Sequence, residues 1–142
     1  MRKEIKYIMG NTLFFGFIGS WVGGAIFLFL LATFGTRPFS FSEYLILSPI
    51  MGFIPASLTG FLFILELKRL IPRFKRDPFW LELFLASKNA FYILAMIWLL
   101  LNSNNQINEE NLVGFAALIF IGVTSAIICA NMMTEWNRKL IP

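Results

Sequence analysis

The sequence predicts an all-α integral membrane protein, a four-transmembrane-helix bundle that forms one transmembrane domain over residues 1–142. The first indication is composition, because 58% of the residues are hydrophobic, 14% are charged and the mean hydropathy is +0.73. A soluble domain carries about a quarter of its residues as charged side chains, since its surface faces water. The second indication is that the apolar residues form long blocks separated by short charged segments, as membrane spans do.

The first span is predicted at about residues 11–34. Three basic residues precede it, which resembles the start of a secretory signal. The uncharged stretch, however, runs from Tyr7 to Thr36, much longer than the roughly 7–15 apolar residues of such a signal. We therefore interpret the segment as an uncleaved anchor that crosses the bilayer.

The second span is predicted at about residues 44–66, where charged residues follow the apolar block. It contains Pro49 and Pro55, which remove two backbone donors and are expected to kink the helix. Neighbouring helices make such prolines tolerable in a membrane.

The third span is predicted at about residues 80–102. Its cleanly apolar part, 90–101, would cover only about 18 Å as a helix, less than the hydrocarbon core of a bilayer. Extension back to Trp80 gives a full crossing. That extension brings Glu82 and Lys88 to the membrane boundary or slightly inside it.

The fourth span is predicted at about residues 112–134, and the orientation follows from the positions of the basic residues. Ten Lys and Arg residues lie in the N-terminal segment, in the connection 68–79 and in the tail, whereas the other two connections share Arg37 alone. Basic residues beside spans are retained on the cytoplasmic side. We therefore expect an N-in/C-in protein of the bacterial inner membrane, with both termini in the cytoplasm.

Small residues recur every fourth position in three of the predicted spans. Residues four apart share one helix face, and small side chains there allow two helix backbones to approach closely. We expect spans one, two and four to pack through these positions, and span three, which lacks such a strip, to lie at the periphery. The candidate packing residues are Gly16, Ser20, Gly24, Gly52, Ala56, Gly60, Gly122 and Ala126.

A second strip of small residues on span one, Gly19 and Gly23, offers a seam for a second copy of the protein. Packing within one chain is the interpretation we favour, because the same small residues serve both purposes. The bilayer is the expected partner in either case. A homo-oligomer or a larger membrane complex remains the further alternative.

Lys88 is the charge predicted to enter the membrane, and it forms a candidate polar site with Asn89, Thr59 and Asn131. Ionisable residues inside spans often mark substrate or ion pathways. The competing interpretation, which we favour, is that the flexible Lys88 side chain snorkels its ammonium back to the cytoplasmic headgroups.

The connection 68–79 combines basic and apolar residues, which suits contact with a membrane surface. Its candidate contacts to anionic lipid are Lys68, Arg69, Arg73, Lys75 and Arg76. The retention of basic residues in the cytoplasm also explains this charge by itself. The basic residues form no extended face of the kind that binds nucleic acid, so no nucleic-acid partner is expected.

Catalytic and cofactor motifs do not occur in the sequence. It has no histidine and a single cysteine, Cys129, and it contains neither a GxxxxGK[ST] nor a GxGxxG loop. We therefore expect no enzyme, no cofactor and no metal site.

The function predicted first is a small inner-membrane accessory or structural subunit that works by helix packing. The alternative is a small oligomeric transporter or channel with a polar cytoplasmic vestibule near Lys88. A lipid-modifying enzyme, with Glu66 and Glu82 as its candidate carboxylates, ranks last.

Overall fold

The computed structural model describes residues 2–34, 41–73, 78–103 and 109–139. Its first helix begins at the N-terminal end of the described chain, nine residues before the predicted span. It consists of α1 (Arg2–Phe14), the π-helical segment η1 (Phe15–Gly19) and α2 (Ser20–Phe34), which follow one another without a break. The basic N-terminal segment is therefore part of the helix.

The second helix, α3 (Phe41–Leu70), continues through both Pro49 and Pro55 and ends in the short 3₁₀ segment η2 (Ile71–Arg73). Thr59 Oγ1 donates a hydrogen bond to the carbonyl oxygen of Pro55 at 2.8 Å, within the same helix. The prolines thus leave α3 as one helix.

The remaining two helices are α4 (Pro78–Leu101) and α5 (Glu109–Arg138), which pack against each other as an antiparallel hairpin. Among the described residues, four helices are long and apolar enough to cross a membrane. The chain is therefore all-helical in its described part, as the sequence predicts.

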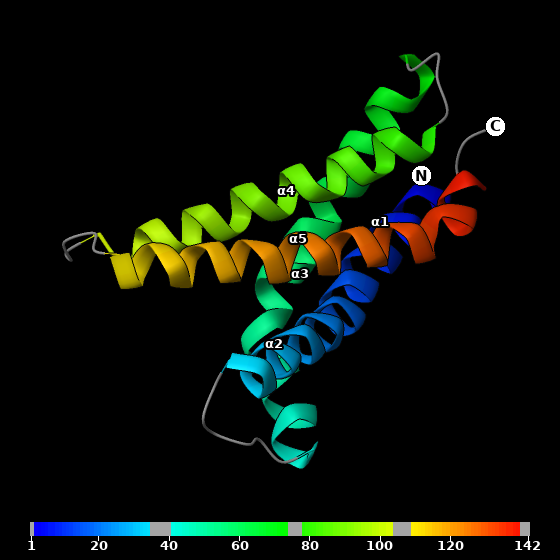
Figure 1. Ribbon diagram of the computed structural model, residues 1–142. Helices are drawn as coiled ribbons and strands as arrows, with labels where there is room; N and C mark the ends of the chain where they lie inside the picture. The colour runs from blue at the N-terminus through cyan, green and yellow to red at the C-terminus, as the bar shows by residue number, and fades with distance from the viewer. Residues whose placement is uncertain (1, 35–40, 74–77, 104–108, 140–142) are drawn as a thin grey trace.

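The four long helices are arranged as two hairpins that diverge. Figure 1 shows that α1, the C-terminal ends of α3 and α5 and the start of α4 lie toward the chain termini, whereas α2 and the start of α3 point away from the other end of the α4–α5 hairpin. Contacts between α3 and α4 join the two hairpins. The molecule is therefore closed at the end that holds the termini and open at the other.

The hydrophobic core lies toward the closed end and draws on all four long helices. Its largest fully buried side chains include Phe15 of η1, Phe63 and Leu67 of α3, and Leu85 of α4. The rings of Phe15 and Phe63 lie 5.3 Å apart between centroids. Small residues of α5, among them Ala126 and Ala130, complete the core.

The expectation that span three is peripheral is wrong. Seven residues of α4 are buried, because the helix packs against both α3 and α5. Ala86 and Ala90, four residues apart, form the small strip that the sequence interpretation overlooked. Tyr92 and Met96 lie on the exposed face, so the aromatic composition describes one side of α4 and not the whole helix.

Candidate functional site

Glycine positions mark where the first helix meets α3. At Gly60, an added Cβ atom would lie 2.6 Å from Phe15 Cβ and 2.7 Å from the carbonyl oxygen of Asn11, so the two backbones leave no room for a side chain. Three further candidate packing residues also lack room for a side chain, here chiefly because of neighbouring side chains. An added Cβ would collide with Phe53 and Ser57 at Gly16, with Ser48 and Tyr44 at Gly24, and with Ser20 at Gly52.

Gly122 has a different neighbour from the one predicted. The sequence interpretation placed it against spans one and two, but a Cβ atom on Gly122 would collide with Leu94 of α4. The physical reason is that α5 pairs chiefly with α4, its partner in the hairpin. A strip of small residues indicates that another helix packs closely there, but it does not identify that helix.

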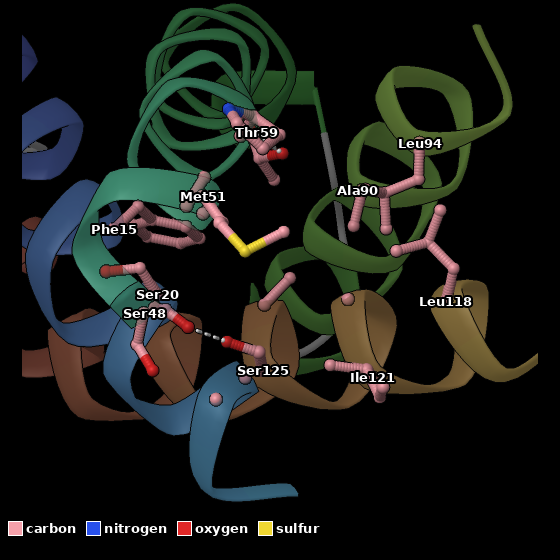
Figure 2. A pocket seen from close by; sticks show the side chains of 18 of the residues that line it. Phe15, Ser20, Ser48, Met51, Thr59, Ala90, Leu94, Leu118, Ile121 and Ser125 are labelled. Atoms are coloured by element: carbon pink, nitrogen blue, oxygen red, sulfur yellow. Dashed lines mark hydrogen bonds between the residues drawn. The ribbon is translucent and has the colours of Figure 1, made fainter. Parts of the chain in front are cut away.

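A partly open cavity of about 310 Å³ lies between the two hairpins, and it is called the interhairpin cavity below. Figure 2 shows its walls: Phe15, Ser20, Ser48, Met51 and Thr59 on one side, and Ala90, Leu94, Leu118 and Ile121 on the other. Small residues from η1, α2, α3 and α5 also line it, namely Gly19, Gly23, Ala56 and Ala126.

Gly19 and Gly23 line this cavity and lie directly beside α5 of the same chain. An added Cβ would lie 3.4 Å from Cys129 Sγ at Gly19 and 3.5 Å from Ile121 at Gly23, which are ordinary contact distances. Packing within the chain therefore leaves room for a single methyl group at either position, unlike at Gly60.

The hydroxyl groups of Ser20, Thr59 and Ser125 donate hydrogen bonds to backbone carbonyls. Ser125 Oγ donates to the Gly19 carbonyl of η1 at 2.6 Å, and Ser20 Oγ donates to the Phe17 carbonyl at 2.9 Å. A π-helical turn disturbs the regular bonding of the helix, and in hydrocarbon its carbonyls need other donors. Ser125 supplies such a donor to the Gly19 carbonyl from α5, and Ser20 adds a second donor to the Phe17 carbonyl, so both contribute to the fold of η1.

Lys88 and Asn89 contact Glu66 of α3. Lys88 Nζ lies 2.6 Å from Glu66 Oε2, and Asn89 Nδ2 donates to the same oxygen at 3.3 Å. The Lys88 ammonium thus has a polar partner from another span, which the snorkelling interpretation favoured from the sequence does not include. The Glu66 carboxylate lies close enough to compensate the charge of Lys88, and about a third of each side chain stays exposed.

The other two residues of the predicted polar site lie elsewhere. Thr59 is buried and lines the interhairpin cavity, while Asn131 is exposed on α5. The structure thus groups Lys88, Asn89 and Glu66, and it does not group Thr59 and Asn131 with them. The four polar residues do not share one vestibule, because α4 turns Lys88 toward α3.

A buried pair of amides joins the first helix to the last. Asn11 Nδ2 donates to Asn137 Oδ1 at 2.8 Å, and Asn137 Nδ2 donates to Asn11 Oδ1 at 3.0 Å. Both side chains are fully buried. Beside them, the rings of Tyr7 and Trp136 stack with centroids 4.6 Å apart. Sequence reasoning missed this link because Asn137 lies beyond the predicted end of the fourth span.

Replacement of Asn137 with leucine is expected to lower the free energy of unfolding by about 1–2 kcal/mol, because Asn11 loses its buried partner. The double replacement of Asn11 and Asn137 with leucine should cost less than the sum of the two single replacements, since no amide is then left alone. Thermal unfolding in detergent measures all three. Strict additivity would contradict the pairing.

Glu82 of α4 is also fully buried, and its Oε2 accepts a hydrogen bond from Thr134 Oγ1 of α5 at 2.7 Å. Together with the Asn11–Asn137 and Glu66–Lys88 pairs, this contact places interhelical polar bonds on both sides of α4 and between the terminal helices. The closed end is therefore held by polar contacts as well as by the core.

The predicted lipid-contacting residues fall into three groups. Lys68 pairs with Glu4 of α1 at 2.7 Å, Arg69 and Arg73 are exposed, and Lys75 and Arg76 lie outside the described residues. The hydrogen bond and the charge of Lys68 hold the pKa of Glu4 below its usual value. The Lys68 charge is therefore compensated, while Arg69 and Arg73 face outward.

Comparisons with protein-family models, with curated proteins and with solved structures found no significant match to this chain.

Proposed function

We propose that this chain is an integral protein of the bacterial inner membrane with both termini and the connection 68–79 in the cytoplasm. The ten-to-one distribution of basic residues supports this orientation. The closed end, with the polar contacts and the chain termini, then lies on the cytoplasmic side. The open end lies toward the outer leaflet.

Within that membrane, the protein acts as an accessory or structural subunit, through helix packing and not through chemistry. The observation that carries this proposal is the interhairpin cavity, whose walls include Gly19 and Gly23 at positions where packing within the chain does not require glycine. Small residues let another helix approach closely, and a cavity between diverging hairpins gives it a place to pack. The proposed partner is a transmembrane helix of another protein that packs at the mouth of the cavity and places side chains in it, because about 310 Å³ is too small for a whole helix.

A transporter is the second candidate, and one observation favours it: the Glu66–Lys88 pair with Asn89 between α3 and α4. Charged residues inside a membrane are typical of substrate and ion pathways. Two features count against it. The pair is mutually compensating, and the hydroxyls of Ser20, Thr59 and Ser125 in the cavity already donate to backbone carbonyls.

The accessory role is tested by filling the cavity without disturbing the fold. In Gly23→Leu the Cβ keeps ordinary contact distances from Ile121 and Ser125, and the substituted position lines the cavity. The matched control is Gly114→Leu on α5, where an added Cβ meets nothing within 4 Å. Blue native electrophoresis of gently solubilised membranes, with thermal unfolding alongside, reports assembly and stability separately.

We expect the wild type and Gly114→Leu to migrate in a complex larger than the protein itself. Gly23→Leu should migrate as the free subunit while unfolding within a few degrees of the wild type. A wild type that migrates alone would contradict the accessory role, as would a Gly23→Leu variant that still assembles. Transport would instead predict full assembly of Gly23→Leu together with a loss of activity in Lys88→Met.

A further inference from the structure

The end of the molecule that holds both chain termini carries an exposed group of cations, called the cationic end below. They come from three separate parts of the chain, the start of α1, the end of α3 with η2, and the residue after α5. The group consists of Arg2, Lys3, Lys6, Arg69, Arg73 and Lys139, and all six side chains are exposed.

Internal contacts bring these three parts together. The Lys68–Glu4 pair joins α3 to α1, and the Asn11–Asn137 amides with the Tyr7–Trp136 ring contact join α1 to α5. Figure 1 shows the N-terminus and the C-terminal end of α5 near each other at this end. The cations therefore belong to one surface of the folded protein, although they are far apart in the sequence.

Most of the carboxylates at this end are already engaged. Glu4 pairs with Lys68, Glu66 pairs with Lys88, and Glu82 is buried against Thr134. Glu135 is exposed on α5. Among the described residues, the cationic end therefore exposes six cations beside the single carboxylate of Glu135, because Glu4 is engaged by Lys68, which is not one of the six.

We propose that the cationic end binds the headgroups of anionic phospholipids in the leaflet beside it. Each exposed cation near an anionic membrane surface adds to the attraction, and a folded arrangement presents several of them at once. We infer lipid as the partner because this surface lies at the end of four helices suited to a bilayer, where headgroups are the nearest anions. Trp80, exposed at the start of α4, has the ring expected at this headgroup level.

This inference rests on the membrane location in the proposed function and is independent of the accessory role. It also extends beyond Arg69 and Arg73, since α1 contributes three further cations and the residue after α5 contributes one. Topology alone requires basic residues on the cytoplasmic side but does not require them to bind lipid. The two explanations differ in what the purified protein does.

The test is a titration of phosphatidylglycerol into the detergent-purified full chain, with native mass spectrometry to measure lipid occupancy and phosphatidylcholine as the neutral reference. The test variant combines Arg69→Gln, Arg73→Gln and Lys139→Gln. The control variant combines Glu4→Gln and Lys68→Gln, which removes a charge pair from the same end and leaves the net charge unchanged.

We expect the wild type to prefer phosphatidylglycerol over phosphatidylcholine, and added salt to weaken that preference. The triple variant should lose roughly a hundredfold in affinity for phosphatidylglycerol, since three cations are removed and each contributes a factor of roughly five. The control variant should bind as the wild type does. Equal binding of the two lipids by the wild type would overturn the proposal, and so would a triple variant with unchanged affinity. Neither result needs a partner protein, so either is distinguishable from failure of the accessory role.

Discussion

Lys88→Met is expected to lower the free energy of unfolding by roughly 1–3 kcal/mol, because it removes the ammonium that lies 2.6 Å from Glu66. The expected loss is smaller than for a fully buried pair, since about a third of each side chain is exposed and water screens the charge that remains. Asn89 still donates to Glu66 but carries no charge. Thermal unfolding in detergent measures the change.

The matched control for this prediction is the double variant Lys88→Met with Glu66→Gln. It removes both charges and keeps the volume of each side chain close to the original, so it should recover much of the stability lost in Lys88→Met. If Lys88→Met is as stable as the wild type, the ion pair contributes nothing measurable. Snorkelling to the headgroups would then be the better description of Lys88.

Gly60→Leu is expected to have the largest effect of any single change considered for this chain. Its Cβ alone would lie 2.6 Å from Phe15 Cβ, and the backbone carbonyl of Asn11, 2.7 Å away, cannot move aside as a flexible side chain does. Overpacking of a core typically costs about 1–3 kcal/mol, and a backbone obstacle puts this variant at or above the upper figure.

Gly114→Leu is the control, because the same substitution there meets open space. It should unfold at nearly the wild-type temperature, whereas Gly60→Leu should unfold far below it or fail to fold. Gly60→Ala is a milder variant for the same measurement, and it should also be destabilised, since its single methyl group already collides with Phe15 and the Asn11 carbonyl. Equal stability of the Gly60 and Gly114 variants would mean that the first helix does not approach α3 as closely as described.

The helices could be predicted from the sequence because a bilayer imposes a strict requirement. A crossing segment must satisfy its backbone polar groups internally, so each long apolar block becomes a helix, and the bounds of α4 lie close to the predicted span. The first helix was predicted too short because its basic first turns are not apolar. They are helical through packing against α3, with Glu4 paired to Lys68.

The neighbours of each helix were harder to predict. Small residues indicate a close contact but not its partner, which is why Gly122 faces Leu94 of α4 and not the first two spans. Ala86 and Ala90 form the same pattern of small residues four apart in α4, but it was not recognised among the bulky residues of that span. A strip of small residues is read reliably only after the exposed and buried faces of its helix are known.

The polar site shows the same limit. Lys88 and Asn89 were identified as polar residues at the membrane boundary, but their partner Glu66 lies 22 and 23 positions away in the chain, respectively. Spacing within one helix cannot reveal such a pairing, because it depends on how α4 lies against α3. The Asn11–Asn137 pair, 126 residues apart, likewise depends on how distant helices pack, and Asn137 in addition lies beyond the predicted end of the fourth span.

The orientation of the chain in the membrane underlies the functional account, and topology reporters test it most directly. Fusions of alkaline phosphatase and of green fluorescent protein are placed after Asn105, in the connection between the third and fourth spans, and after the C-terminus. We predict phosphatase activity and no fluorescence at Asn105, and fluorescence and no phosphatase activity at the C-terminus, because the basic residues hold both ends in the cytoplasm. Reporters that place the two positions on the same side would contradict the four-span, N-in/C-in account.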